Sequence, residues 1–392
     1  MFRKTFFVAS LLLLSIFGIA QINLPQLSEN SKIIMFTCEP GSELYAGFGH
    51  SALWVSDPAQ GIDRLYNYGT FDFNTPNFYW LFIRGRLDYM LTVTTARRFI
   101  NEYDYRKIGV TGQTLDLDLN EKQRAFELLE TNLLPENRFY KYDFFYDNCA
   151  TRIRDVVVEA CSGEVDFKTL DRKQSFRQML FPYLTYTPWT KFGINLILGY
   201  SSDKIASPFE YQFLPEQMQM SFNNAIVKRN EQENKLVSTE RRFLSSKLDF
   251  SYNLLTDPAL IFSLLFLLTG LLTLIEIRSK RYIKWFDLVI NSIGIVAGLF
   301  LLFMWIGTDH SATNYNMNIL WMLPAQSIFM VSVFLKNKSK KHRLVNIAFI
   351  MICTIILAMF FWPQETEISF FIISFIFALR YLFHKRINPV NE

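Results

Sequence analysis

The chain has 392 residues, a formal net charge of +4 and a hydrophobic content of 50% that includes 39 phenylalanines. This length allows two or three domains, and so small a net charge does not indicate a nucleic-acid partner. The sequence contains neither a CxxC nor an HExxH motif. We therefore expect no metal site and no bound cofactor.

The N-terminus has the pattern of an export signal. Arg3 and Lys4 precede the apolar run FFVASLLLLSIFGIA, which ends at the small residue Ala20. A basic start followed by an apolar segment and small residues is typical of a secretory signal peptide. We expect residues 1–20 to be a cleaved signal peptide or a retained signal anchor, and in both cases the next residues lie outside the cytoplasm.

Residues 21–180 are expected to form an exported domain of the α+β class. Short runs such as KIIMF and SALWV, separated by turn residues, favour strands. Apolar residues at helical spacing predict helices over 120–134 and 148–160. Residues 181–257 are expected to be an amphipathic and helical connecting region at the membrane surface. That region includes the apolar stretch 189–200 and a charged helix near 228–248.

The last third of the chain reads as a membrane domain of about five transmembrane helices. Lysine and arginine gather in the loops 276–284 and 336–343 and in the C-terminal tail, whereas the loops 307–318 and 363–367 contain neither residue. By the positive-inside rule the basic segments are cytoplasmic, and five spans then place residues 21–257 on the outer side. We predict a multi-pass protein of the inner membrane with a periplasmic N-terminal domain. The expected spans are 258–275, 285–306, 319–335, 344–362 and 368–383, and Arg380 in the last one is expected to snorkel to the interface.

Elimination leaves few residues for chemistry on the outer side. His342 and His384 lie in cytoplasmic segments and Cys353 lies inside a span. Cys149 is the strongest nucleophile candidate, because it stands where a helix begins, and the free N–H groups and positive dipole end favour a thiolate. His50 begins the strand SALWV after the turn GFG, so it is the candidate base. The alternative is a capped helix start with a small buried cysteine.

A third residue is expected to orient the imidazole of His50. Asn67, Tyr68 and Asp72 in RLYNYGTFDF are the candidates, and the sequence does not choose among them. Cys38 and Cys161 both lie outside the cytoplasm, where disulfides persist, so they could pair with each other. Two free thiols are the alternative.

Two further groups of residues are candidates for substrate binding. The polar loop 308–324 could bind a polar substrate end near the lipid headgroups, or it could be an ordinary loop with an aromatic belt residue. Its candidate residues are His310, Asn314, Asn316, Asn318 and Trp321. The second group lies close in sequence to the two catalytic candidates and consists of Tyr45, Ser51 and Asn148.

The motifs CEPGSELYAGFGHSALWV, YNYGTFDF, FYDNCATRIRD, FGINLILG and HSATNYNMNILWMLP, in this order, resemble the Lnb-type family. These are membrane proteins of Bacteroidota, and the family's named member is similar to a lipoprotein N-acyltransferase. The order of histidine before cysteine is also similar to the circularly permuted branch of the papain-like (NlpC/P60-related) superfamily. That resemblance implies a permuted papain-like exported domain, with Cys149 as the nucleophile and His50 as the base.

The resemblance implies that an acyl chain passes from a membrane phospholipid, through a Cys149 thioester, to the N-terminal amine of a diacylated lipoprotein. The expected partners are thus a phospholipid donor and a lipoprotein acceptor. Two alternatives remain open at this point. One is a membrane-tethered cysteine peptidase or amidase of the cell envelope, and the other is a non-enzymatic membrane receptor or scaffold.

Overall fold

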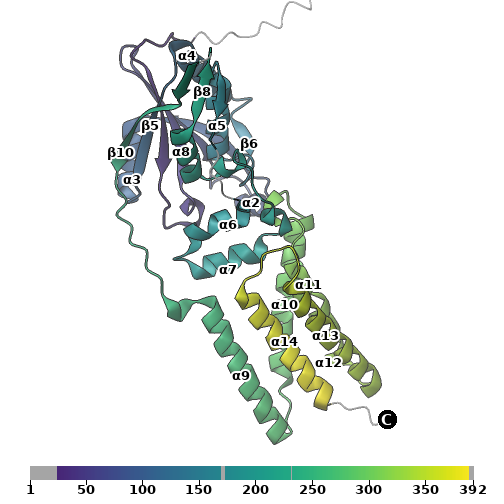
Figure 1. The fold of residues 1–392 in the computed structure, drawn as a ribbon. Coiled ribbons are helices and arrows are strands. Elements are labelled where there is room, and N and C mark those ends of the chain that lie inside the picture. Colours follow the sequence, from purple (N-terminus) through teal and green to yellow (C-terminus); the bar gives the residue numbers. More distant parts are fainter. Residues whose placement is uncertain (1–23, 169–172, 231, 388–392) are drawn as a thin grey trace, which may run out of the picture.

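The computed structural model describes residues 24–168, 173–230 and 232–387, and the expected export signal at 1–20 lies outside these ranges. A domain of strands and helices stands at one end of the molecule, and a bundle of long helices stands at the other (Figure 1). A layer of short helices lies between them. The α+β domain followed by a helical membrane domain is the architecture that the sequence predicts.

Seven strands form the main sheet in the order β10-β5-β1-β2-β3-β4-β6, and every neighbouring pair is antiparallel. The register places Cys38 at the end of β1 opposite His50 at the start of β2. The candidate base therefore stands at the end of the central strand of the sheet, where a loop enters that strand. The strands are β1 (Lys32–Cys38), β2 (His50–Asp57), β3 (Ile62–Thr70), β4 (Asp88–Thr94), β5 (Val110–Leu115), β6 (Phe139–Lys141) and β10 (Val237–Leu244).

The charged segment near 228–248 is not a helix, and that prediction is wrong. It forms β8 (Ile226–Arg229), β9 (Gln232–Lys235) and β10, and β10 pairs with β5 at the edge of the main sheet. Edge strands commonly carry charged side chains that prevent pairing with a further strand. The many charges of this segment therefore fit an exposed edge strand as well as an exposed helix. β8 and β9 join β7 (Glu164–Asp166) in a second, three-stranded sheet.

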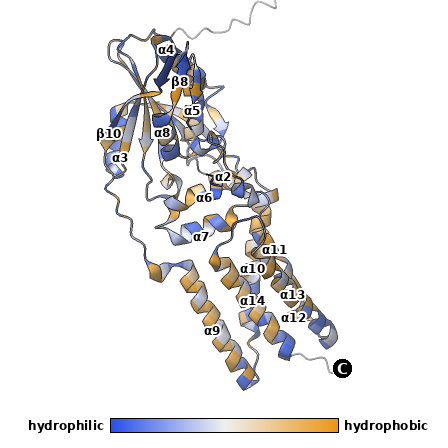
Figure 2. Cartoon of the chain, in the orientation of Figure 1, coloured by the Kyte–Doolittle hydropathy of each residue, from blue (hydrophilic) through white to orange (hydrophobic). Residues whose placement is uncertain are grey.

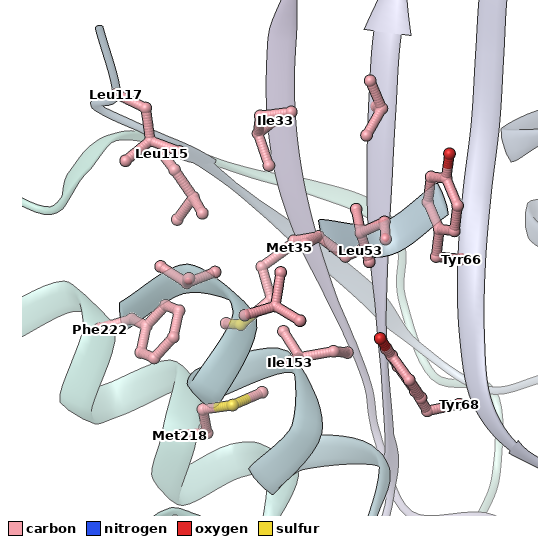
Figure 3. Packing of buried hydrophobic residues seen from close by; sticks show 14 of the residues in the cluster. Ile33, Met35, Leu53, Tyr66, Tyr68, Leu115, Leu117, Ile153, Met218 and Phe222 are labelled. Atoms are coloured by element: carbon pink, nitrogen blue, oxygen red, sulfur yellow. The ribbon is translucent and has the colours of Figure 1, made fainter. Parts of the chain in front are cut away.

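Helices cover both faces of the main sheet. On one face, α4 (Leu119–Leu133), α5 (Cys149–Ala160) and α8 (Pro215–Asn224) pack against the strands, and Figure 3 shows Met35 and Leu53 beside Ile153 of α5. Fully burying such a side chain contributes about 1.5–3 kcal/mol. On the other face, α3 (Ala96–Tyr105) packs through Phe99 and Tyr103. The core therefore fixes the start of α5 against the sheet.

Four helices of the second half are long and apolar enough to cross a membrane, among the described residues. They are α9 (Pro258–Ser279), α10 (Lys284–Ile306), α13 (Lys338–Met359) and α14 (Ile368–Ile387). Figure 2 shows hydrophobic residues along them. The expected span 319–335 is broken into α11 (Asn318–Met322) and α12 (Pro324–Phe334), because proline has no N–H and clashes with the preceding turn.

Arg380 does not snorkel, and that expectation is wrong. Its side chain in α14 is fully buried, with Nη1 2.5 Å from Oε2 of Glu276 in α9 and Nε 2.7 Å from Oδ1 of Asp287 in α10. A charge inside a membrane domain is costly unless it is paired within the protein. These ion pairs therefore tie three of the long helices together.

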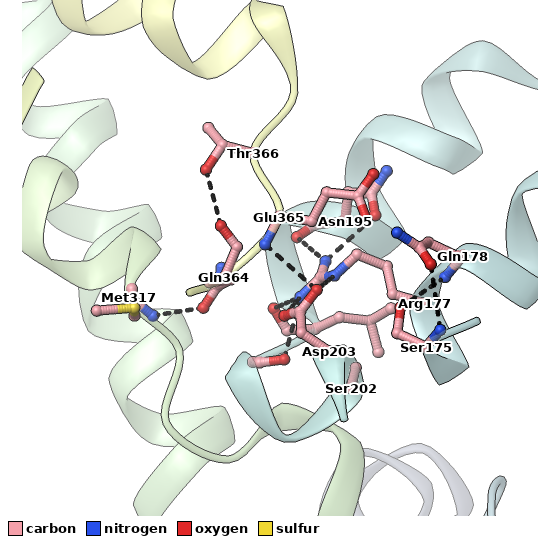
Figure 4. A network of polar contacts seen from close by, with 12 residues as sticks. Ser175, Arg177, Gln178, Asn195, Ser202, Asp203, Met317, Gln364, Glu365 and Thr366 are labelled. Carbon is pink, nitrogen blue, oxygen red and sulfur yellow. Dashed lines mark hydrogen bonds and ion pairs between the residues drawn. The ribbon is translucent and has the colours of Figure 1, made fainter. Parts of the chain in front are cut away.

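Short helices connect the two parts of the chain. α6 (Phe176–Leu180) and α7 (Pro188–Ile197) lie between the exported domain and the long helices (Figure 1). The buried Arg177 donates from Nε to Oδ1 of Asp203 at 2.8 Å, and this oxygen also accepts from the N–H of Glu365 at 3.2 Å (Figure 4). The network fixes the connecting layer to an outer loop of the membrane domain.

Candidate active site

Cys149 is the first residue of α5, and the residue before it caps the helix. Asn148 Oδ1 accepts from the N–H groups of Ala150 at 2.9 Å and Thr151 at 3.0 Å. Its Nδ2 donates to the carbonyl oxygens of Phe144 and Phe213 at 2.7 and 2.8 Å. Asn148 is 2% exposed, so the structure gives it the role of positioning Cys149 rather than the predicted contact with substrate.

The imidazole of His50 lies between Cys149 and Asn67. His50 Nε2 is 2.6 Å from Oδ1 of Asn67 in β3, and the ring also forms a hydrogen bond with the sulfur of Cys149. Since Nε2 is engaged by Asn67, Nδ1 is the nitrogen left for the sulfur. Cysteine, histidine and asparagine therefore form a chain of contacts in which the asparagine fixes the orientation of the ring.

The other two candidates for the third position lie elsewhere. Tyr68 is buried, and its hydroxyl accepts from Nδ2 of Asn132 at 2.8 Å, while burial raises its pKa to about 12. Asp72 is exposed and accepts from the main chain of Asn74 at 2.9 Å, which makes it a turn residue. Of the three residues, only Asn67 contacts the candidate base.

The electrostatics of the dyad favour an ion pair. Burial by itself raises the pKa of the Cys149 thiol, but the charge and hydrogen bond of His50, together with the N–H groups of Ser51 and Ala150, outweigh it and lower this pKa. For His50, burial acts to lower the pKa, whereas Cys149 and Asn67 raise it, and the net direction is upward. A lowered cysteine pKa beside a raised histidine pKa stabilises thiolate and imidazolium together.

Tyr142 is a site residue that the sequence reasoning missed. Its hydroxyl forms a hydrogen bond with Cys149, and burial raises its pKa, so it stays protonated as a donor. Gly69 packs closely against both residues, because a Cβ there would lie 3.3 Å from the Tyr142 ring and 3.7 Å from the Cys149 Cβ. The φ of Gly69 is +85°, which also favours glycine. The tyrosines of FYKYDFFYDNC gave no signal to separate this one from its neighbours.

The arrangement suits attack on a carbonyl carbon. The thiolate is the nucleophile, and the Tyr142 hydroxyl stands beside it as a donor for an oxyanion. Asn148 caps the N–H groups of Ala150 and Thr151, but not that of Cys149. An N–H at the first helical position has no partner within its helix, so the Cys149 N–H is available as a second donor. Among the described residues, no group of three or more histidine, cysteine, aspartate and glutamate side chains is placed to hold a metal ion.

Two family models match the chain, one in its N-terminal half and one in its C-terminal half. Residues 24–187 match the Lnb N-terminal periplasmic domain, and residues 250–389 match the Lnb transmembrane domain. The chain belongs to the Lnb family. Neither the curated proteins nor the solved structures contain a match. The family assignment makes the chain a multi-pass membrane protein whose N-terminal domain is periplasmic.

Of the two possibilities considered for the outer cysteines of this Lnb protein, the structure has the free thiols and not the disulfide. Cys38 and Cys161 are both free thiols. Cys38 lies opposite His50 in the β1–β2 register, whereas Cys161 follows the last residue of α5. Twelve helical residues separate the two ends of α5 by about 18 Å, and a disulfide requires Cα atoms within about 7 Å. The cysteine beside the dyad therefore does not reach the far end of the helix.

The polar loop that follows α10 docks the membrane domain onto the periplasmic domain. His310 Nε2 is 3.1 and 3.0 Å from the carbonyl oxygens of Phe82 and Ile83, at the end of α2 (Phe78–Ile83). Asp309 Oδ2 accepts from Arg86 Nε at 2.7 Å. The structure thus uses the imidazole of His310 as a bridge between domains, and it does not join His310 to the dyad.

Asn316, Asn318 and Trp321 are also engaged within the protein. Asn316 donates to the carbonyl oxygens of Leu196 and Ile197 in α7, at 2.8 and 2.9 Å. Asn318 Oδ1 accepts from the indole N–H of Trp321 at 3.0 Å. Trp321 is fully buried, so it is not a residue of an aromatic belt. These contacts fix α7 to the membrane domain, and they leave the two buried side chains Asn318 and Trp321 without a surface for substrate.

Of the three remaining predicted substrate contacts, only Ser51 lies beside the dyad. Asn314 accepts through its main-chain oxygen from the N–H of Ser201 at 3.4 Å. Tyr45 is 63% exposed, and Arg106 lies over its ring at 5.6 Å. Ser51 is fully buried next to His50, and its main-chain N–H contacts the sulfur of Cys149. Substrate roles for Asn314 and Tyr45 stay predictions.

One contact places the dyad close to the membrane domain. Asp143, six residues before Cys149, accepts at Oδ2 from the hydroxyl of Ser311 at 2.5 Å. Its Oδ1 accepts from the N–H groups of Phe145 and Tyr146, which form the turn leading to Cys149. The turn that carries the nucleophile is therefore bonded directly to an outer loop of the membrane domain.

Proposed function

We propose that this Lnb-family protein is a lipoprotein N-acyltransferase of the inner membrane. It takes an acyl chain from a phospholipid and transfers it, through a thioester on Cys149, to the N-terminal amine of a diacylglyceryl-cysteine lipoprotein. The observation that carries the proposal is the Cys149–His50–Asn67 chain, held on a turn that is bonded to the membrane domain. A nucleophile at this place is within reach of lipid-anchored substrates.

The first half-reaction forms the acyl-enzyme. The Cys149 thiolate attacks the ester carbonyl of the phospholipid, and the carbon–sulfur bond forms as the carbon–oxygen bond to the glycerol breaks. The leaving alkoxide takes the proton of the His50 imidazolium and departs as a lysophospholipid. During the attack, the Tyr142 hydroxyl and the Cys149 amide are the donors that face the developing oxyanion.

The second half-reaction transfers the acyl chain to nitrogen. The acceptor ammonium gives one proton to the now neutral His50, and the free amine attacks the thioester carbonyl. Collapse of the tetrahedral adduct expels the Cys149 thiolate and releases a second proton to solvent. The product is an amide, and the thiolate–imidazolium pair is restored. Both substrates are confined to the membrane plane, which supplies the proximity that a soluble domain would lack.

The extensive docking between the domains supports transferase action over peptide cleavage. A membrane-tethered peptidase or amidase needs the same dyad, but a single anchor would suffice for it. Here the contacts Arg86–Asp309, His310–Ile83 and Ser311–Asp143 hold the nucleophile turn against the membrane domain. Such a fixed position at the bilayer surface serves substrates that stay in the membrane.

Replacing the nucleophile tests the proposal. In cells that depend on this protein, Cys149→Ser should abolish N-acylation, with the yield of N-acylated lipoprotein peptides falling by about a thousandfold or more. Mass spectrometry of lipoprotein N-terminal peptides measures this, with the protein level checked in parallel. Cys161→Ser, a change at the other end of α5, is the matched control and should retain activity. Persistent N-acylation in the Cys149 variant would contradict the proposal.

A further inference from the structure

A large cavity lies beside the dyad on the side of the connecting layer. Its volume is about 850 Å³, and it is lined by the loop 39–49 that leads into His50, by segments 182–190 and 246–250, and by parts of α8 and β10. Phe48 and Gly49, the two residues before His50, are part of its wall. None of the catalytic roles above uses this space.

The floor of the cavity connects to the nucleophile through one pair of opposed residues. Thr37 of β1 lines the cavity and lies opposite Ser51 of β2, and side chains paired in this way have Cβ atoms about 5 Å apart. The N–H of Ser51 contacts the Cys149 sulfur. Met35 and Leu53, two residues along each strand and thus on the same face, pack in one cluster with Cys149. The cavity and the sulfur are therefore on the same face of the sheet.

Two neighbouring hydroxyl groups, of which only that of Thr37 lines the cavity, have no hydrogen-bond partner among the described residues. Thr37 is 4% exposed and Ser51 is 0% exposed, and neither Oγ1 of Thr37 nor Oγ of Ser51 is satisfied. A buried hydroxyl without a partner costs about 1–3 kcal/mol, so such groups are uncommon in a folded protein. A buried, unpaired hydroxyl on the cavity wall, as at Thr37, is what a site for a hydrogen-bonding ligand requires.

The walls of the cavity carry an excess of carboxylates. Arg242 is the one cationic side chain among the described residues that line it, and it pairs with Glu39. Glu216 and Glu240 also line the cavity, and no described cation lies within 4.0 Å of either one. Glu216 instead accepts from the Tyr183 hydroxyl at 2.7 Å, and Glu240 Oε2 accepts from the side-chain amides of Gln113, Gln219 and Asn223 at 3.1, 3.2 and 2.7 Å. These neutral donors leave both negative charges in place, so the two carboxylates attract a cation and repel a phosphate.

We propose that this cavity is the acceptor site and binds a polypeptide N-terminus through its ammonium group. The inference rests on the proposed function and adds which of the two substrates the cavity takes. Glu216 and Glu240 attract the ammonium, and the hydroxyl of Thr37 hydrogen-bonds the amine or the first peptide group as it approaches the thioester. Apolar residues such as Leu44, Leu248 and Phe250 also line the cavity, and they face the lipid part of the acceptor.

The two half-reactions allow a direct test on the full-length protein in detergent micelles. A phospholipid with a labelled acyl chain reports formation of the Cys149 acyl-enzyme, and a synthetic diacylglyceryl-cysteine peptide with a free amine reports transfer. In the double variant Glu216→Gln, Glu240→Gln, acyl-enzyme formation should stay within about twofold of wild type, while the KM for the peptide rises about tenfold at low salt. Glu233→Gln, an exposed change on β9, is the matched control and should alter neither value.

A second variant separates substrate binding from structure. Thr37→Val keeps the shape of the side chain and removes a hydroxyl that has no partner in the described part of the chain, so the melting temperature should stay the same or rise. Transfer to the peptide should nevertheless fall about fivefold or more, because a hydrogen bond to the acceptor is lost. A structural role for Thr37 would lower the melting temperature together with transfer.

Three outcomes are informative. An unchanged KM for the peptide in both variants would overturn the acceptor site. Slower acyl-enzyme formation with an unchanged KM would assign the cavity to the phospholipid donor and would overturn the proposal as well. A wild-type protein that forms no acyl-enzyme on Cys149 with any phospholipid would instead refute the proposed function, which is a separate result.

Discussion

The two histidines on the outer side of the membrane, His50 and His310, have opposite surroundings. The His50 ring forms two side-chain hydrogen bonds, one with Asn67 Oδ1 at 2.6 Å and one with the sulfur of Cys149. His310 bonds main-chain oxygens at the end of α2, at 3.1 and 3.0 Å. The first arrangement is suited to proton transfer with the thiol, and the second holds two domains together.

The comparison shows why residue type alone does not identify a catalytic histidine. Both residues lie on the outer side and in motifs that resemble those of the family, and the sequence predicts His50 as the base and His310 as a substrate contact. The difference lies in the partner, because a thiol beside an imidazole changes the pKa of each group, whereas a carbonyl oxygen only fixes the ring. Substitutions at the two regions should therefore give different readouts.

The largest effect is expected for His50→Ala. In wild type the lowered pKa of Cys149 keeps the thiolate present as the pH falls below about 8.5, the ordinary value. In the variant, only the N–H groups of Ser51 and Ala150 still oppose the effect of burial, so the pKa of Cys149 rises and alkylation by iodoacetamide should move to higher pH, while acyl transfer should fall about a thousandfold. Mass spectrometry of Cys149 alkylation against pH measures the shift.

Cys161 is an internal reference for that experiment, because burial raises its pKa to about 12. It should stay unreactive near neutral pH in both proteins. An alkylation profile of Cys149 that is the same in wild type and in His50→Ala would show that the imidazole does not activate the thiol.

A smaller effect is expected for Asn67→Ala, which removes the acceptor that orients His50. Activity should fall about tenfold to a hundredfold, since a misplaced group loses part of the proximity advantage. Asn67→Asp keeps an acceptor oxygen and adds a negative charge, which raises the pKa of His50 further. Activity falls when His50 loses its proton, so in this variant the fall should occur at a higher pH. A pH–rate profile of acyl transfer measures the change. An Asn67→Ala protein with full activity would remove Asn67 from the site.

The smallest effect is expected for His310→Ala. The variant loses one contact to the end of α2, worth about 1 kcal/mol, while the Arg86–Asp309 and Ser311–Asp143 contacts remain. The melting temperature should fall by about 2–4 °C, and activity should decrease less than about tenfold with the acyl-enzyme still formed. Thermal melting and acyl-enzyme yield provide the two readouts. A loss as large as that of His50→Ala would place both histidines in the chemistry.

The sequence predicts the features of this chain that depend on local pattern. Apolar length and loop charge predict the membrane domain, and helical spacing predicts α5 with Cys149 at its start. The same patterns fail where a distant part of the chain decides the structure. The strand β10 carries the charges of a solvated helix and is a strand only because β5 offers an edge. Arg380 is buried because two other helices supply Glu276 and Asp287.

The candidate site shows the same limit. The dyad follows from elimination, because few histidines and cysteines are on the outer side. The contact of Tyr142 with the sulfur depends on how the turn before α5 folds back onto β3, and the choice of Asn67 over Tyr68 depends on which face of β3 meets His50. The sequence does not show whether Cys38 and Cys161 pair, because their separation depends on the length and direction of α5.

The central claim is that Cys149 is a thiolate nucleophile that accepts an acyl chain from a phospholipid. Its most direct test is the intact mass of the full-length protein after incubation with phospholipid and without an acceptor. The account predicts one added acyl group, located on Cys149 and removed by neutral hydroxylamine, with no such group in Cys149→Ser. An adduct on Cys161 instead, or no hydroxylamine-sensitive adduct at all, would contradict it.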